Sequence, residues 1–184
     1  MTLTKTPICN FGDKAKDFNL KSTENKLISL KDIKGENGTL VMFICNHCPY
    51  VKAIIKDLVD DVKFLEKIGI KSVSIMSNDV KNYPEDSFEN MISFSKSNNF
   101  SFPYLIDETQ DVAKKYGAVC TPDFFGYNKN LELQYRGRIR ELKDLMPVKT
   151  GDSDLKNAMK LIAETENGPK NQIPSMGCNI KWFK

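Results

Sequence analysis

A chain of 184 residues has the length of one typical domain and can bury a hydrophobic core without disulfide staples. Its 40% hydrophobic and 28% charged residues are ordinary for a folded protein and exclude a low-complexity or disordered chain. The 27 basic and 24 acidic residues leave a net charge of only +3, which gives no indication of nucleic-acid binding. We therefore expect a single domain over residues 1–184.

The apolar segments are too short to span a membrane. The longest run, Leu40 to Cys45, falls far below the roughly 20 residues that a spanning helix needs. The N-terminal segment has no apolar core after its lysine, so the sequence predicts no signal peptide. We therefore expect the protein in the cytoplasm, without a membrane partner. In that reducing compartment, cysteines are more often catalytic or metal-binding than structural.

The hydrophobic pattern predicts the first strands of the chain. Apolar alternation near Phe18 and Leu20, and again from Leu27 to Leu30, predicts a short N-terminal β-hairpin. The continuous apolar run Thr39 to Ile44 predicts a central strand that is buried on both faces.

Two helices follow in the predicted order. Apolar residues recur at helical spacing from Val51 to Ile68, and Pro49 stands near the start, where its missing N–H costs little. After a further strand, Pro84 opens a second predicted helix. Its acidic residues Glu85 and Asp86 suit the positive end of the helix dipole.

The second half of the chain adds strands, helices and a hairpin before an irregular tail. The expected elements are strand Phe102–Ile106, helix Val112–Tyr116, hairpin strands Phe124–Tyr127 and Leu131–Arg136, helix Leu155–Ile162, and the tail over residues 166–184. Alternating strands and helices followed by a hairpin indicate an α/β fold, with a mixed central sheet covered by helices on both faces.

The strongest functional signal is the pair Cys45 and Cys48, which lies where the buried strand gives way to the helix. Unpaired N–H groups and the positive dipole of a helix N-terminus favour a thiolate over a thiol. Thiols in such motifs have pKa values of roughly 3.5–7.5. We therefore expect Cys45 to be the exposed nucleophile and Cys48, inside the first turn, to be the resolving thiol.

His47 is the only histidine of the chain and lies between the two cysteines. When protonated, it would stabilise a neighbouring thiolate and make the couple more oxidising than a typical cytosolic thioredoxin. The alternative is a solvent-facing polar residue with no effect on the redox potential. The sequence favours neither reading.

The segment Phe43 to Tyr50 resembles the active-site segment of thioredoxin-like proteins in the alkyl hydroperoxide reductase/thiol-specific antioxidant (AhpC/TSA, or redoxin) superfamily. Four further segments are similar to that family: Gly12–Phe18, Cys120–Phe125, Tyr135–Ile139 and Pro174–Trp182. The resemblance implies a thioredoxin-like fold with an N-terminal β-hairpin extension. It also implies that Pro122 is a cis proline facing the cysteine pair, with Thr121 beside Cys45. An ordinary trans proline at a strand edge is the alternative.

The remaining cysteines are open to two interpretations. Cys120, in the proline loop, and Cys178, in the tail, could each approach the pair as a further resolving thiol. A buried core cysteine and a tail anchor are the simpler interpretations, which we favour. We expect Cys9, near the N-terminus, to have no role in the site.

Arg136, Arg138 and Arg140 are the only arginines, and in a strand their spacing would put them on one face. They could form an anion site, although a solvated edge-strand face that discourages aggregation is favoured. Trp182 is expected to anchor the tail by burial. The active site could be bordered by Asn78 and Asp79, which directly follow a strand, and by Tyr83.

These patterns favour a thiol–disulfide oxidoreductase that exchanges disulfides with protein substrates. Such an enzyme needs no bound cofactor, but it needs a redox partner that resets the cysteine pair. A metal-binding module that uses Cys45, His47 and Cys48 is a weaker alternative, because the other cysteines are isolated and no second histidine exists.

A thiol peroxidase is the stronger alternative, because the resembled superfamily includes the peroxiredoxins. Their peroxidatic cysteine lies in a Pro-x-x-x-Thr/Ser-x-x-Cys motif. Counting back from Cys45 gives Met42 and Gly38 at the two key positions, and counting back from Cys48 gives Cys45 and Val41. Neither frame supplies the proline or the hydroxyl, so direct peroxidase activity is the less favoured function.

Overall fold

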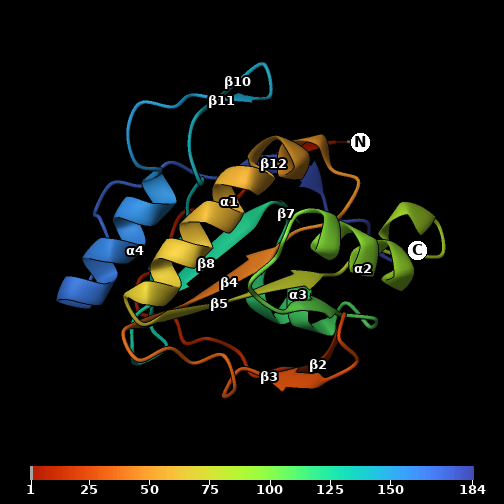
Figure 1. The fold of residues 1–184 in the computed structure, drawn as a ribbon, viewed down its shortest axis with the longest axis horizontal. Coiled ribbons are helices and arrows are strands. Elements are labelled where there is room, and N and C mark those ends of the chain that lie inside the picture. Colours follow the sequence, from red (N-terminus) through yellow and green to blue (C-terminus); the bar gives the residue numbers. More distant parts are fainter. Residues whose placement is uncertain (1) are drawn as a thin grey trace.

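The computed structural model describes residues 2–184 (Figure 1). Up to the middle of the chain its elements are β1 (Leu3–Lys5), β2 (Asn19–Ser22), β3 (Leu27–Ser29), β4 (Gly38–Phe43), α1 (Pro49–Lys67), β5 (Ile70–Met76), the 3₁₀ turn η1 (Pro84–Asp86) and α2 (Phe88–Ser97). The later elements are β6 (Tyr104–Ile106), α3 (Asp111–Tyr116), β7 (Cys120–Thr121), β8 (Asp123–Tyr127), β9 (Leu133–Tyr135), β10 (Leu142–Lys143), β11 (Met146–Pro147), α4 (Asp154–Thr165) and β12 (Met176–Asn179).

A seven-stranded sheet in the order β3-β2-β6-β5-β4-β8-β9 forms the centre of the molecule. The sheet is mixed: β4, β5 and β6 run parallel, whereas β2, β3, β8 and β9 pair antiparallel. Helices α1 and α4 lie side by side across one face (Figure 1), and α3 packs into the hydrophobic cluster of the other. This architecture is the flanked mixed sheet that the sequence predicts. Every helix in the described part of the chain is too short or too polar to cross a bilayer.

Strand β4 lies in the middle of the sheet, and all its residues are buried. Its pleat sends Leu40 and Met42 into the hydrophobic cluster beneath α1 and α4, whereas Val41 and Phe43 enter the cluster on the α3 side. Burial on both faces explains why the strand reads as one continuous apolar run. Its carboxyl end therefore delivers the next residues of the chain into the interior.

The two predicted hairpins and the helix after β4 are confirmed. Strand β2 pairs with β3, with Leu20 opposite Ile28, and β8 pairs with β9, with Gly126 opposite Tyr135. Helix α1 begins at Pro49 and buries an apolar stripe against the sheet.

The predicted helix at Pro84 begins later than expected. Pro84 opens only the 3₁₀ turn η1, and Ser87 then caps α2 by accepting a hydrogen bond from the Asn90 N–H. Met91 is the one buried residue of α2. Asp86 consequently lies in a tight turn with a buried side chain instead of in an exposed first helical turn.

The tail over residues 166–184 is not irregular throughout, as the sequence had suggested. It contains β12, which pairs antiparallel with β1 on one side and with β7 on the other, where Cys178 stands opposite Thr121. A Cβ at Gly177 would lie 1.9 Å from the Thr121 carbonyl oxygen, so glycine permits this close pairing. Long-range pairing of this kind leaves no signal in a four-residue segment.

The tail is also not anchored by its tryptophan. Trp182 is 38% exposed, so the predicted burial is wrong. The chain is held instead by backbone contacts, because the Lys181 N–H donates to Asn78 Oδ1 (2.9 Å) and the Gln110 amide donates to the Lys181 carbonyl (2.7 Å).

The three arginines do not share one solvated strand face, and Arg140 pairs with Asp57 of α1 at 2.9 Å. Strand β9 ends before Arg136, whose buried guanidinium donates to the buried carboxylate of Asp123 at 2.9 Å and to the Gly117 carbonyl at 2.8 Å. Burial raises the pKa of Asp123 to about 6, although Arg136 opposes this shift. Arg138 pairs with the more exposed Asp154. The Arg136–Asp123 pair fixes the start of β8.

We expect Arg136→Met to reduce the free energy of unfolding by about 3–5 kcal/mol, because it leaves the Asp123 carboxylate buried without a partner. Arg138→Met, the matched control, removes a half-exposed pair and should cost no more than ~1 kcal/mol. Urea denaturation followed by circular dichroism measures both values. Equal losses for the two variants would show that the buried pair has no special structural role.

Candidate active site

The two cysteines of the motif lie at the junction of the central sheet with helix α1. Cys45 comes two residues after β4, and Cys48 is the N-cap residue of α1. Both are free thiols. Cys45 is 1% exposed and Cys48 0% exposed, so the expectation that Cys45 is an exposed nucleophile is wrong. The cause is the fully buried strand before it, which ends inside the core.

Thr121, the last residue of β7, and Pro122, which follows it, face this pair. The Thr121–Pro122 peptide bond is cis, as the family resemblance implies. The Thr121 hydroxyl lies 3.3 Å from Cys45 Sγ, and the Thr121 carbonyl oxygen lies 3.2 Å from Cys48 Sγ. One residue thus contacts both sulfurs, although 73 residues of sequence separate it from Cys48.

The two thiols interact directly, and the interaction polarises them. A hydrogen bond from Cys45 lowers the pKa of Cys48 to about 5, against the opposing effect of burial and with help from the backbone N–H groups of Cys178 and Val51. The same hydrogen bond, then burial and the charge of Asp86, raise the pKa of Cys45. When the pair loses a proton, the hydrogen bond therefore favours a negative charge on Cys48 over one on Cys45. The N-terminal end of α1 stabilises it there.

His47 lies between the thiols and a buried carboxylate. Its Nδ1 is 2.7 Å from Asp86 Oδ2 and 4.0 Å from Cys45 Sγ. The hydrogen bond with Asp86 raises the pKa of His47 above its usual value, although burial opposes this. Tyr83 stacks on the imidazole, with ring centroids 6.0 Å apart. His47 is thus a fixed part of the site, and the interpretation as a solvent-facing residue is wrong.

Asp86 is the site residue that sequence reasoning missed. Its carboxylate is fully buried and accepts hydrogen bonds from the backbone N–H groups of Asn46 (2.8 Å) and His47 (3.3 Å) and from Asn78 Nδ2 (2.7 Å). Burial raises its pKa, but the hydrogen bonds from His47 and Asn78 outweigh this and hold the pKa below its usual value. This carboxylate fixes the turn between the two cysteines. In the sequence, Asp86 looks like an ordinary acidic residue near a helix start.

The remaining cysteines differ in their relation to the pair. Cys178 is 4% exposed and hydrogen bonds with Cys48. Cys120 is fully buried, and its sulfur lies 3.7 Å from the Pro122 carbonyl oxygen. Burial raises the pKa of Cys120 far above its usual value, which disfavours the reactive thiolate. Cys9 is half-buried, and burial raises its pKa to about 11.

The donor atoms that could hold a metal are not those expected. The ligand atoms of Cys45, His47 and Asp86 lie within 4.8 Å of one another, whereas Cys48 is not part of this group. The Asp86 carboxylate already accepts four hydrogen bonds, and its Oδ2 lies only 2.7 Å from His47 Nδ1. A metal would have to displace the proton of that pair. The arrangement is therefore better suited to orienting His47 than to binding an ion.

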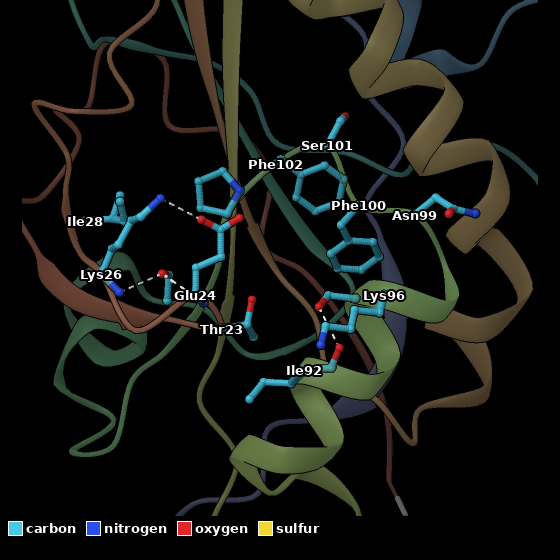
Figure 2. Close-up of a pocket in the computed structure, with 13 residues that line it drawn as sticks. Thr23, Glu24, Lys26, Ile28, Ile92, Lys96, Asn99, Phe100, Ser101 and Phe102 are labelled. Atoms are coloured by element: carbon cyan, nitrogen blue, oxygen red, sulfur yellow. Dashed lines mark hydrogen bonds and ion pairs between the residues drawn. The ribbon is translucent and has the colours of Figure 1, made fainter.

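A hollow of about 430 Å³ lies between the β2–β3 turn and the end of α2 (Figure 2), and neither cysteine nor histidine lines it. Another hollow, of about 250 Å³, adjoins the site and is lined by Tyr50, Ile54 and Pro122 together with Arg138 and Met176. Of these two hollows, the second could seat a substrate near the sulfurs.

The AhpC/TSA family model matches residues 11–142, which include the whole cysteine motif and the cis proline. The chain belongs to the AhpC/TSA family. Residues 143–184, with α4 and β12, lie outside the matched region.

Two solved structures match almost the whole chain. An uncharacterized conserved protein from Geobacillus kaustophilus is 37% identical, with a TM-score of 0.94, over 100% of this chain and 97% of its own. A hypothetical protein from Sinorhizobium meliloti 1021 is 36% identical, with a TM-score of 0.90, over 98% of each chain.

A curated protein of Coxiella burnetii, "Putative peroxiredoxin bcp", is 27% identical over 115 residues, which are 62% of this chain and 71% of that protein. Solved disulfide oxidoreductases, a thiol:disulfide interchange protein and a peroxidoxin share the fold at 14–17% identity. This redoxin is therefore thioredoxin-like in fold.

We expect the imidazole of His47 to titrate above pH 6.5 and to titrate lower in Asp86→Asn, because the carboxylate stabilises the charged ring. The chain has one histidine, so NMR observes it without ambiguity. Since the folded-state pKa is the higher one, the stability that this pair adds is complete below about pH 6.5 and declines as the pH rises through the raised value. Glu85→Gln, at the adjacent exposed position, is the control. Unchanged titration in Asp86→Asn would disprove the coupling.

Proposed function

We propose that this redoxin is a thiol–disulfide oxidoreductase that exchanges disulfides with protein substrates through Cys45 and Cys48. The observation that carries the proposal is the direct contact of two free thiols at a helix start, where both also contact Thr121. Sulfurs that share a hydrogen bond are close enough to interconvert between dithiol and disulfide with little rearrangement.

The two thiols have different roles in the exchange. A proton passes from Cys45 to Cys48 along their hydrogen bond, and the Cys45 thiolate, next to protonated His47, attacks a substrate sulfur. A mixed disulfide forms and the first substrate sulfur leaves as a thiolate. Cys48 then gives its proton to the departing substrate thiolate and attacks Cys45, while the backbone N–H groups of Cys178 and Val51 stabilise the Cys48 thiolate. The Cys45–Cys48 bond closes, and the substrate leaves reduced.

The hollow of about 250 Å³ beside Pro122 is consistent with binding of a peptide segment of the substrate. Its lining combines aliphatic side chains such as Ile54 and Met176 with the cationic Arg138, so an extended segment with apolar and acidic residues is a suitable occupant. Because Cys45 is 1% exposed, contact with a substrate disulfide requires a local opening around it. A reductant in the cytoplasm, the proposed location, then resets the pair.

Reduction of a peroxide is the second candidate. The burial of both cysteines favours a small oxidant over a protein, and the Coxiella relative carries a peroxiredoxin name. The Thr121 hydroxyl also lies 3.3 Å from Cys45 Sγ. In the peroxiredoxin motif the hydroxyl residue lies three positions before the cysteine, whereas Thr121 lies in a different segment of this chain.

We expect the wild-type protein, coupled to a reductase, to reduce the disulfides of insulin, and Cys45→Ser to fall to the background rate because it lacks the attacking sulfur. Cys9→Ser, which changes a cysteine outside the site, should keep full activity. The measurement is insulin turbidity against time.

Activity that survives in Cys45→Ser would refute the assigned nucleophile. An inactive wild type whose thiols disappear rapidly on mixing with hydrogen peroxide would replace disulfide exchange with peroxide reduction.

A further inference from the structure

Strand β12 brings a third cysteine to the pair. Cys178 stands opposite Thr121 in the β7–β12 ladder, and Thr121 is the residue that both active-site sulfurs contact. Gly177, with no Cβ to collide with the Thr121 carbonyl, permits the close approach of the two strands. Helix α1 also packs against β12. Backbone pairing therefore fixes the position of Cys178 next to the start of α1.

Cys178 contacts the sulfur of Cys48. Its backbone N–H and its thiol both hydrogen bond with that sulfur, which also receives the hydrogen bond from Cys45. All three cysteines belong to one buried cluster. Cys48 is therefore the shared neighbour of two thiols, and it could form a disulfide with either.

We propose that Cys178 is a third redox-active thiol, which takes over the disulfide that Cys45 and Cys48 form. This inference rests on the proposed dithiol chemistry of that pair. The Cys178 thiolate attacks Cys48 Sγ, the Cys48–Cys178 bond forms and the Cys45–Cys48 bond breaks. Cys45 leaves as a thiolate and takes up the proton that Cys178 has lost. The exchange is an isomerisation, so it needs no additional oxidant or reductant.

The charge on Cys48 explains why Cys178 does not react earlier. Burial, followed by the hydrogen bond and the negative charge of Cys48, raises the pKa of Cys178 to about 12. When Cys48 enters a disulfide, its charge and its hydrogen bond to Cys178 are both lost. Two of the three causes then disappear, and the nearby charge of Lys181 still favours the thiolate. Cys178 thus becomes more acidic when its target disulfide exists.

The isomerisation separates the stored disulfide from the sulfur that meets substrates. Afterwards the bond joins Cys48 and Cys178, and Cys45 is again a thiol. The oxidised protein can then form a mixed disulfide through Cys45 with a second molecule, while the internal disulfide is retained.

Cys120 provides a matched control from the same strands. It is as deeply buried as the pair and adjoins Thr121, but its ladder partner is Asn179. Neighbouring residues of a strand point to opposite faces, and the Cys120 sulfur lies near the Pro122 carbonyl instead of near Cys48.

The test maps disulfides in the full-length wild type, Cys45→Ser and Cys120→Ser after equilibration with oxidised glutathione. The samples are quenched in acid, alkylated, digested without reduction and analysed by mass spectrometry. We expect wild type and Cys120→Ser to give both the Cys45–Cys48 and the Cys48–Cys178 peptides. In Cys45→Ser, the Cys48–Cys178 peptide should dominate, and alkylation of Cys178 should fall by roughly tenfold or more relative to the reduced protein.

Two failures are distinguishable. If wild type forms the Cys45–Cys48 disulfide alone, and Cys45→Ser gives only a Cys48–glutathione adduct with Cys178 fully alkylated, the third-thiol inference is wrong and the proposed function stands. If wild type forms neither internal disulfide, both are wrong. Circular dichroism checks the fold of each variant, and the wild-type map remains a test even if a variant does not fold.

Discussion

The chemistry of this site depends on one contact between distant parts of the chain: Thr121 touches both sulfurs of the cysteine pair. Its hydroxyl lies 3.3 Å from Cys45 Sγ, and its carbonyl oxygen lies 3.2 Å from Cys48 Sγ. Three elements keep it there. Strand β4 ends inside the core, strand β12 pairs with β7 on the far side, and the buried Arg136–Asp123 pair fixes β8 immediately after the cis proline. A shift in any of them would separate the thiols from their common partner.

Negative and positive groups alternate around the cysteine pair. Asp86 is a permanent buried negative charge, His47 is a cation when protonated, and Cys48 carries the negative charge of the thiol pair. Asp86 opposes ionisation of Cys45 directly, yet it also keeps the proton on His47, which favours a thiolate next to the imidazole. Because the group is buried, these interactions are screened less than they would be at the surface. Protonated His47 therefore counteracts the unfavourable effect of Asp86 on the ionisation of Cys45.

The parts of this structure that depend on local pattern were predictable from the sequence. Burial on both faces makes β4 a continuous apolar run, and Pro49 after a cysteine pair indicates a helix start. The cis bond at Pro122 followed from a resemblance, which the family match to residues 11–142 confirms. Those features need only neighbours in sequence or a motif already known.

The features that sequence reasoning missed depend on long-range contacts. In the sequence, Asp86 looks like a helix-terminal acid. Its role comes from hydrogen bonds with the backbone of Asn46 and His47, which lie 40 and 39 residues earlier in the chain. The pairing of β12 with β7 is equally invisible, because a four-residue strand has no periodicity that distinguishes it from a loop. The burial of Arg136 could be predicted only from its ion pair with Asp123, which lies on the neighbouring strand β8. The distribution of charge between the thiols followed from the same unseen contacts.

The central claim is that Cys45 and Cys48 form one two-electron couple. A redox titration of the purified protein in glutathione buffers, followed by alkylation and intact-mass measurement, tests it most directly. We predict that two thiols per chain leave the alkylatable pool together, in a single two-electron transition with a midpoint above the roughly −270 mV of thioredoxin. Stepwise loss of single thiols, or stable glutathione adducts on Cys45 and Cys48, would contradict the account.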